Sequence, residues 1–357
     1  MASTTASWTQ DILIYGANGY TAELITELAL KEGAKPILAG RSADKIAPLA
    51  QRHGLPMRAF GLDDPAQLMV GLAQVGVVLN CAGPFSRTAH KLAQACVQAG
   101  VHYLDITGEI EVFEDLATLS AQAKSRQVML MPGTGFDVVP SDCLAAHLKR
   151  RLPDATSLTL AFQASGAPSH GTATTMAENM HKGGFVRRGG KLQAVPSAWL
   201  TRDIDFGSGP VSTMTIPWGD VATAWVSTGI PDIEVFMAMP RPVIMGTKLT
   251  RHMGWLLGSA PVQRAIKRAI DARPAGPDAS QRAQGGVRLW GEARNTAGRV
   301  VTSRLHTPDG YALTAQTAWD IAKRVASGDL QPGFQTPSMV YGADYVLGFT
   351  GTSRSDL

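Results

Sequence analysis

The sequence has only three cysteines and no long apolar run, and both absences narrow its function. Cys81, Cys96 and Cys143 form an odd number at spacings that match no metal motif, so we expect neither a disulfide framework nor a metal site. Thiols that stay reduced are typical of a cytoplasmic protein. No run of about 18 apolar residues occurs, and Met1–Gln10 lacks the features of a secretory signal, so we expect no membrane-spanning helix and no export.

A strong excess of charge of either sign is also missing. The 33 Lys and Arg residues slightly outnumber the 29 Asp and Glu residues, for a net charge of +4. This balance suits a phosphate-bearing small molecule, whereas nucleic-acid binding would call for a dense basic stripe interleaved with aromatics. We therefore expect a small-molecule ligand and no nucleic-acid partner. A length of 357 residues with 45% hydrophobic content predicts about two well-buried domains.

Short apolar runs alternate with helical stretches over residues 1–150. The runs are continuous, which is typical of parallel strands covered by helices on both faces. We therefore predict an α/β fold whose first domain is a Rossmann-type doubly wound parallel sheet. The expected strands are 11–15, 36–39, 58–60, 75–80, 102–104 and 128–131, and the expected helices are 20–32, 43–53, 65–72, 87–99 and 111–125.

From about residue 155 the pattern changes to period-two alternation, which predicts half-buried antiparallel strands. We expect a mixed α+β substrate domain with a largely antiparallel sheet over 151–310. A C-terminal helix near 311–327 and a tail, together 311–357, should pack back near the domain interface. The expected strands are 157–162, 211–216, 222–227, 233–239, 287–294 and 300–305, with a hairpin turn at 294–299 and an exposed loop at 274–286.

The first expected strand leads directly into Gly16-Ala17-Asn18-Gly19-Tyr20-Thr21-Ala22 and then a helix. Gly16 permits a tight turn, Gly19 lets the backbone approach a pyrophosphate, and Ala22 permits close packing of helix on strand. The phosphates would meet N–H groups at the positive end of the helix dipole. A plain strand–turn–helix connection is the alternative, but the position after the first strand favours a dinucleotide site.

The end of the second strand indicates which dinucleotide binds. An NAD site places an acid about 20 residues on to bind the ribose 2′-hydroxyl. Here the strand ends instead in Ala39-Gly40-Arg41-Ser42. Arg41 offers a fork of donors to a 2′-phosphate, and no carboxylate in this motif repels it. We therefore expect NADP(H) as the cofactor; the alternative is that Arg41 is a solvated surface residue.

Further strand ends supply candidate cofactor contacts. Asp63 can accept a bond from the adenine amino group or instead cap the next helix. Cys81-Ala82-Gly83-Pro84-Phe85 is the segment where we expect the nicotinamide ribose to pass, and Ser86 is the expected cap of the helix that follows. Gly135 and Phe136 come after the sixth strand, where the backbone can approach the nicotinamide.

Hydride transfer needs a group that stabilises or protonates the charge developing away from the attacked carbon. Tyr103 and Asp105 lie at the end of the fifth strand, although a structural hydrogen-bonded pair is the alternative. His170 is the third candidate, because histidine exchanges protons near neutral pH; a plain loop histidine is its alternative. Ser141 and Asp142 are instead expected to cap a helix.

The segment Thr250–Arg273 mixes apolar residues with Arg264, Lys267 and Arg268. Its amphipathic composition suits a lid over a lipid-like substrate, a peripheral membrane contact, or an ordinary helix packed on the sheet. These three alternatives stay open, as does a homodimer.

The motifs GANGYTA, AGRS, NCAGPF, HYLDITGE and PGTGFDVVPSD together resemble those of the saccharopine dehydrogenase-like reductases, and in particular the trans-acting enoyl reductases of bacterial lipid synthesis. The segments IPWGD, STGIP, WGE and DGYALTA…TPSMVYG extend the resemblance over most of the chain. The resemblance implies NADP(H) and hydride transfer. It implies less about the substrate, because lysine-pathway relatives act on a polycarboxylate and need cationic clamps, and we find no convincing set of paired arginines.

These observations predict an NADPH-dependent reductase that acts on an apolar or lipid-derived enoyl or carbonyl substrate. Two alternatives stay open. One is an imine-reducing amino-acid dehydrogenase of the saccharopine type, and the other is a non-catalytic NADP-binding sensor or scaffold.

Overall fold

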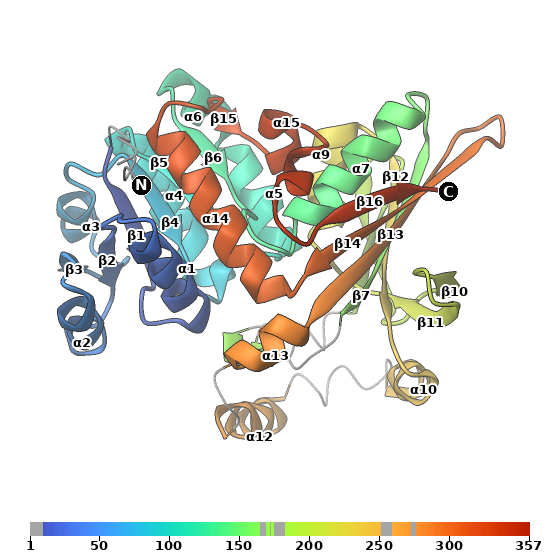
Figure 1. Cartoon of the computed structure of the whole chain (residues 1–357), viewed down its shortest axis with the longest axis horizontal. Helices are drawn as coiled ribbons and strands as arrows, with labels where there is room; N and C mark the ends of the chain where they lie inside the picture. Colours follow the sequence, from blue (N-terminus) through green and yellow to red (C-terminus); the bar gives the residue numbers. More distant parts are fainter. Residues whose placement is uncertain (1–9, 165–168, 172, 175–182, 251–258, 273–275) are drawn as a thin grey trace, which may run out of the picture. The chain divides into compact units, whose positions relative to one another are not determined.

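A computed structural model describes residues 10–164, 169–171, 173–174, 183–250, 259–272 and 276–357. The chain divides into two compact units (Figure 1). Unit 1 comprises the chain up to Phe136 together with Tyr311–Val340, and unit 2 comprises Asp137–Gly310 together with Tyr341–Leu357. The first boundary therefore lies before helix α7 (Val139–Arg151), not at residue 150 as expected.

Helix α7 belongs to unit 2 because it packs directly on the second sheet. A side chain at Gly291 in that sheet would come within 2.6 Å of Leu148 of α7, so helix and sheet are in close contact. The C-terminal residues do not form a separate segment either. They divide between the two units after Val340.

The sheet of unit 1 is parallel throughout and confirms the predicted doubly wound fold. Its order is β15-β6-β5-β4-β1-β2-β3, which contains the 3-2-1-4-5-6 arrangement of dinucleotide-binding domains. The short strand β15 (Gly333–Phe334) was not predicted; it comes from the C-terminal part of the chain and pairs with β6. The other strands are β1 (Ile12–Tyr15), β2 (Ile37–Gly40), β3 (Met57–Ala59), β4 (Val77–Asn80), β5 (His102–Asp105) and β6 (Met129–Met131).

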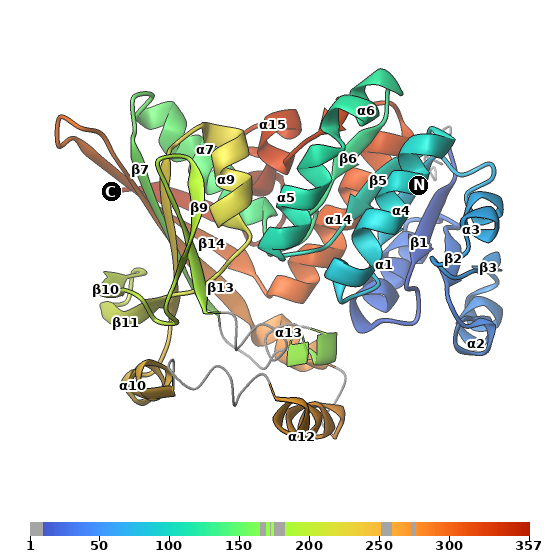
Figure 2. The ribbon, with the colours of Figure 1, turned by 180° about the vertical axis from the view of Figure 1, so that it is seen from behind.

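Helices cover both faces of this sheet. Figure 1 shows α1 and α14 over one face, and Figure 2 shows α4 and α5 over the other. Trp319 and Lys323 of α14 both bind the carboxylate of Glu32, which follows α1. The helices are α1 (Tyr20–Lys31), α2 (Ala43–His53), α3 (Pro65–Gly71), α4 (Phe85–Ala99), α5 (Ile110–Thr118), α6 (Ser120–Ser125), α14 (Gly310–Ala326) and α15 (Pro337–Tyr341).

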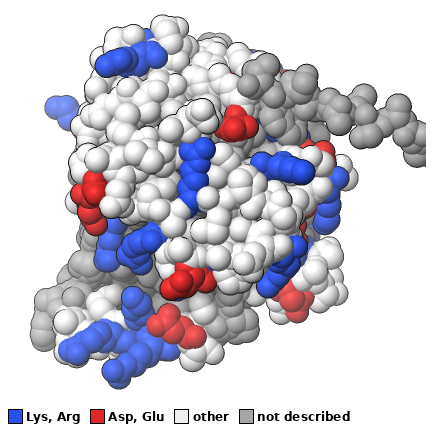
Figure 3. Space-filling model, turned by 90° about the vertical axis from the view of Figure 1, so that its left-hand side faces the viewer, with Lys and Arg blue, Asp and Glu red and all other residues white. Residues whose placement is uncertain are grey.

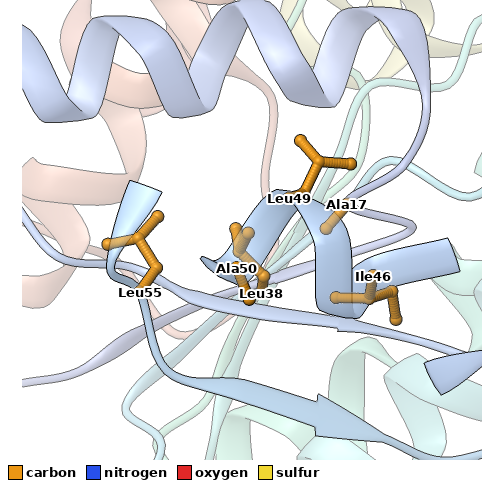
Figure 4. Close-up of a cluster of buried hydrophobic side chains, with 6 residues drawn as sticks. All are labelled: Ala17, Leu38, Ile46, Leu49, Ala50 and Leu55. Carbon is orange, nitrogen blue, oxygen red and sulfur yellow. The ribbon is translucent and has the colours of Figure 1, made fainter. Parts of the chain in front are cut away.

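An apolar cluster fixes the start of the dinucleotide turn. Ala17, directly after Gly16, is fully buried and belongs to the same cluster as Leu38 of β2 and Ile46 of α2 (Figure 4). Burial of an aliphatic side chain as large as leucine stabilises the fold by about 1.5–3 kcal/mol. The cluster therefore holds the turn against β2 and α2.

Unit 2 is built on a mixed sheet of order β10-β11-β12-β7-β13-β14-β16, with β8 paired to β12 and β9. β7 and β12 are parallel and the other pairs are antiparallel. The strands are β7 (Ser157–Ala164), β8 (Gly184–Arg188), β9 (Lys191–Val195), β10 (Thr201–Asp205), β11 (Pro210–Thr215), β12 (Asp232–Ala238), β13 (Gly286–Arg294), β14 (Val300–Pro308) and β16 (Ser353–Asp356).

Several elements of unit 2 differ from expectation. The predicted strand 222–227 is helix α9 (Asp220–Thr228), which packs on α7 and ends at Gly229 in the left-handed conformation. The expected loop 274–286 contains helix α13 (Ala279–Gln284), which begins with a capping box formed by Asp278 and Gln281. Both helices depend on local capping and packing that alternation of apolar residues does not reveal.

The expected amphipathic segment 250–273 is not one helix in the described structure. Helix α10 is described over Arg241–Thr250, and helix α12 covers Ala260–Asp271 after its extended cap residue Ser259. Residues 251–258 lie outside the described residues.

Candidate functional site

The turn between β1 and α1 is held in place by backbone contacts. The N–H groups of Gly16 and Ala17 both donate to the carbonyl of Ala39, over 2.8 and 3.0 Å. Gly16 has a φ of 80°, and a Cβ there would lie 2.7–2.8 Å from atoms of Ala82. Only glycine fits this position, because a side chain would be strained by the backbone and would collide with the end of β4.

The N-terminus of α1 fits the pyrophosphate of a dinucleotide. Its cap residue, Gly19, supplies no side chain to bind the first-turn N–H groups, and a Cβ there would lie 3.2 Å from the carbonyl of Gly16. Asn18 is exposed and Thr21 half-buried, while the ring of Tyr20 meets that of Tyr311 edge to face. Uncapped amides at the positive end of a helix dipole suit an anion.

Cationic side chains lie beyond this turn. Arg41 is exposed immediately after β2, and within the described residues its guanidinium has no ion-pair partner. Ser42 is the cap residue of α2, but its side chain makes no cap bond. Asp63 is fully exposed and pairs with Lys91 of α4, and this bond lowers the pKa of Asp63.

Asp63 is not a helix cap, which was one of its two predicted roles. The cap of α3 is the neighbouring Asp64, whose carboxylate accepts bonds from the N–H groups of Ala66 and Gln67. The contact of Asp63 with adenine stays a prediction.

Asn80, at the end of β4, fixes the segment Cys81–Phe85. Its side-chain oxygen Oδ1 accepts from the N–H of Ala82 at 3.0 Å, and its side-chain Nδ2 donates to the Tyr103 hydroxyl at 3.1 Å. Thr88 completes the arrangement by donating to the carbonyl of Ala82. Cys81, Ala82, Pro84 and Phe85 are partly exposed and Gly83 is exposed, so the segment can meet a ligand.

Tyr103 and Asp105 form a buried hydrogen-bonded pair. The Tyr103 hydroxyl donates to Asp105 at 2.8 Å, and the other oxygen of Asp105 accepts from the N–H groups of Thr107 and Gly133, each at 2.9 Å. Burial raises the pKa of Asp105 to about 7, and the three hydrogen bonds act in the opposite direction. Neither side chain is exposed, so the pair positions the loops after β5 and β6.

Glu109 closes the N-terminus of α4. Its two carboxylate oxygens accept from the N–H groups of Phe85 and Ser86, at 2.9 and 3.0 Å. The helix begins at Phe85, so the expectation that Ser86 caps it with its side chain is wrong. No local pattern marks this contact, because the carboxylate comes from the following β–α loop.

The segment after β6 is supported by the C-terminal helix α14. Thr314 accepts a hydrogen bond from the N–H of Phe136 at 2.9 Å, and a Cβ at Gly135 would lie 2.7 Å from its methyl group. Thr317 donates to the carbonyl of Thr134. A helix more than 170 residues away in the sequence therefore shapes this segment.

His170 belongs to unit 2, whereas Asp105 belongs to unit 1. Its catalytic role stays a prediction. Ser141 and Asp142 lie inside the first turn of α7, whose cap residue is Val138, so they are not the caps that we expected. Asp142 and Asp220 are both buried, and burial raises the pKa of Asp220 well above its ordinary value.

Comparison with known proteins agrees with this geometry. Residues 12–131 match the saccharopine dehydrogenase NADP binding domain. The chain is 25% identical to a trans-acting enoyl reductase of Mycobacterium ulcerans over 361 residues, covering 85% of this chain and 86% of that protein. It is 36% identical to the enoyl reductase of the same name from Mycobacterium leprae over 152 residues, covering 40% of this chain and 36% of that one.

The fold has a solved counterpart. The apo structure of saccharopine dehydrogenase (L-Glu forming) from Saccharomyces cerevisiae superposes with a TM-score of 0.67 at 13% identity, covering 98% of this chain and all of that one. This likeness concerns the fold alone. Residues 12–131 of the first unit are thus similar to the NADP-binding domain of saccharopine dehydrogenase, and the cofactor is NADP(H).

Proposed function

We propose that the protein is an NADPH-dependent reductase that transfers hydride to an apolar, lipid-derived enoyl or carbonyl compound. The observation that carries this proposal is the extent of similarity to the enoyl reductase of Mycobacterium ulcerans. It covers 85% of the chain, so it includes much of unit 2 and not the cofactor domain alone.

The residues of unit 1 divide the work of binding the cofactor. The turn at Gly16 and the start of α1 would hold the pyrophosphate, and Arg41 would hold the 2′-phosphate. The segments 81–85 and 135–136 lie at the carboxyl edge of the sheet, where doubly wound folds bind their ligands. Bound NADPH would supply the hydride.

Tyr103 and Asp105 serve this proposal as positioning residues. Asp105 joins the loop after β5 to the loop after β6, and Tyr103 joins Asp105 to Asn80. This chain of bonds fixes three strand ends relative to one another. Such fixed geometry matters because hydride transfer requires donor and acceptor atoms to be held about 3–3.5 Å apart.

Turnover by the purified protein tests the proposal. NADPH oxidation is measured with a panel of enoyl thioesters, ketones, and imines formed from amino acids, and a Gly16→Val variant serves as the control without cofactor binding. Consumption of NADPH with enoyl or ketone substrates supports the proposal. Turnover confined to imines would replace it with amino-acid metabolism, and tight NADPH binding with no turnover across the panel would indicate a sensor.

A further inference from the structure

Helix α10 in unit 2 presents large apolar side chains to solvent. Ile244 is buried in a cluster with Ala198 and Met214, which fixes the orientation of the helix on the sheet. With that side inward, Met245 and Leu249 are 71% and 79% exposed, and Val243 is also exposed. Met245 and Leu249 are four residues apart, so they lie on the same face of the helix. Such exposure costs free energy in water, so neighbouring apolar side chains of this size indicate a docking site.

The segment before β10 enlarges this surface. Trp199 and Leu200 are both exposed, and they follow Ala198, which packs against Ile244 of α10. The Nζ of Lys248 lies 3.3 Å from the hydroxyl of Thr201, so the helix and the start of β10 are in contact. We call these five exposed side chains the α10 patch: Trp199, Leu200, Val243, Met245 and Leu249.

Unit 2 also carries exposed positive charge on a second helix, α12. Helices α10 and α12 carry the cations Arg241, Lys248, Arg264, Lys267 and Arg268, against the single acid Asp271. Arg241 faces Asp203 at 3.6 Å, whereas Arg264, Lys267 and Arg268 are exposed. Figure 3, which views the molecule from the left-hand side of Figure 1, shows Lys and Arg side chains, with some Asp or Glu beside them, at its lowest part, where α12 lies.

The two helices expose different kinds of side chain: α10 exposes apolar side chains, and α12 exposes cations. In α12 the apolar residues Val262, Ile266 and Ile270 are half-buried or buried, so its cations are the side chains that face solvent. In α10 the apolar side chains are the exposed ones. Exposed apolar side chains on one helix and exposed cations on another helix of the same unit are typical of a protein that rests on an anionic lipid surface.

We propose that the α10 patch and the cations of α12 dock this protein on the surface of an anionic lipid bilayer. Among the described residues, no helix is both long enough and apolar enough to cross a bilayer, so the contact is peripheral. A second copy of the chain is a poorer occupant, because a symmetric contact would bring the same cations face to face. The proposal is independent of the substrate that the protein reduces.

Vesicle sedimentation tests the proposal. The full-length protein is mixed with vesicles of phosphatidylcholine alone or with phosphatidylglycerol added, at low and high salt. We expect binding to the anionic vesicles that weakens with salt. The variant Met245→Gln/Leu249→Gln should bind at least about tenfold more weakly, because two exposed apolar anchors are lost. A wild-type protein that stays in the supernatant with anionic vesicles would overturn the proposal.

Matched variants distinguish binding through this surface from non-specific adsorption to the vesicles. Val70→Gln removes an apolar side chain that is 75% exposed on α3 of unit 1, and it should leave vesicle binding unchanged. Arg264→Gln/Lys267→Gln/Arg268→Gln should weaken binding, whereas Lys31→Gln/Lys35→Gln/Arg126→Gln removes the same charge from exposed positions of unit 1 with a smaller effect.

Equal losses in each variant and its matched control would overturn the proposal. A second result would also overturn it: neither the wild type nor any variant binds vesicles, and Met245→Gln/Leu249→Gln abolishes self-association of the protein. The α10 patch would then be a contact with a second copy of the chain. NADPH affinity is measured in every variant as a check of folding.

Discussion

Helices α1 and α4 both begin at the carboxyl edge of the parallel sheet, yet their N-termini differ in one respect. The cap residue of α1 is Gly19, which has no side chain to cap the first-turn amides. The first-turn amides of α4, at Phe85 and Ser86, are already bound by the carboxylate of Glu109. Both helices have the same kind of dipole, but only α1 offers it to an external anion. Local capping thus decides which helix can serve as a phosphate site.

The largest expected effect comes from filling the turn before α1. Gly16→Val forces a β-branched side chain into positive φ and against Ala82, so we expect NADPH affinity to fall at least about a hundredfold. NADH affinity should fall as much, because both coenzymes share the pyrophosphate. Dissociation constants from fluorescence titration measure this. Gly348→Ala, with nothing within 4 Å of its new Cβ, is the matched control. A Gly16→Val protein that folds and binds NADPH normally would contradict the site.

Asp105 joins the loops that follow β5 and β6. Asp105→Asn replaces an acceptor of three hydrogen bonds with an amide that cannot accept all of them, so we expect a loss of about 2–3 kcal/mol in the free energy of unfolding. Urea denaturation measures it. Asparagine has nearly the same shape as aspartate, so the substitution changes the hydrogen bonds and leaves the packing in place. An unchanged stability would show that Asp105 does not hold the loops.

The same variant yields a prediction about pH. The pKa of Asp105 is about 7 in the folded protein and near 3.8 when unfolded, so its contribution to stability is greatest below about pH 4 and is lost as the pH rises to 7. Other carboxylates also titrate, so the difference between wild type and Asp105→Asn is the quantity to follow. We expect the wild type's advantage over the variant to shrink across this range. An advantage that grows with pH would show that the folded pKa is lowered instead.

We expect Arg41 to distinguish the two coenzymes, which share the pyrophosphate expected at α1. Arg41→Ala removes a charge-assisted bond to the 2′-phosphate, so we expect the KM for NADPH to rise about tenfold while that for NADH hardly changes. Arg52→Ala, at the exposed far end of α2, is the matched control and should change neither. Equal effects of Arg41→Ala on both coenzymes would refute its assigned role.

The contrast between α1 and α4 also shows what sequence can predict. Gly16 and Gly19 are set by backbone space at the end of a strand, so their spacing was sufficient to predict the turn. The role of Arg41 at a 2′-phosphate stays a prediction. Glu109 and Thr314 act on segments that are adjacent only after folding, and no local pattern marks them. Asp63 was misjudged as a candidate cap because two consecutive acids compete and Asp64 takes the position.

Unit 2 was less predictable for a related reason. The alternation of small and apolar residues in 222–227 suggested a strand, but burial against α7 on one side and Gly229 at the end favour helix α9. Strands β8, β9 and β10 were not predicted at all. β9 and β10 are largely exposed, so they lack the apolar alternation by which the other strands were found. The pattern of burial in unit 2 is set by its tertiary packing.

The smallest expected effect comes from removing the carboxylate that caps α4. Glu109→Ala removes two hydrogen bonds and a charge that favours the helix dipole, so we expect a loss of about 1 kcal/mol in the free energy of unfolding. NADPH affinity should fall far less than in Gly16→Val, because Glu109 holds Phe85 at the end of the segment 81–85 and not the pyrophosphate turn. Because the amides of Phe85 and Ser86 then become available, added inorganic phosphate should raise the Tm of Glu109→Ala more than that of the wild type. If phosphate stabilises both proteins equally, the carboxylate of Glu109 is not what keeps α4 from binding anions.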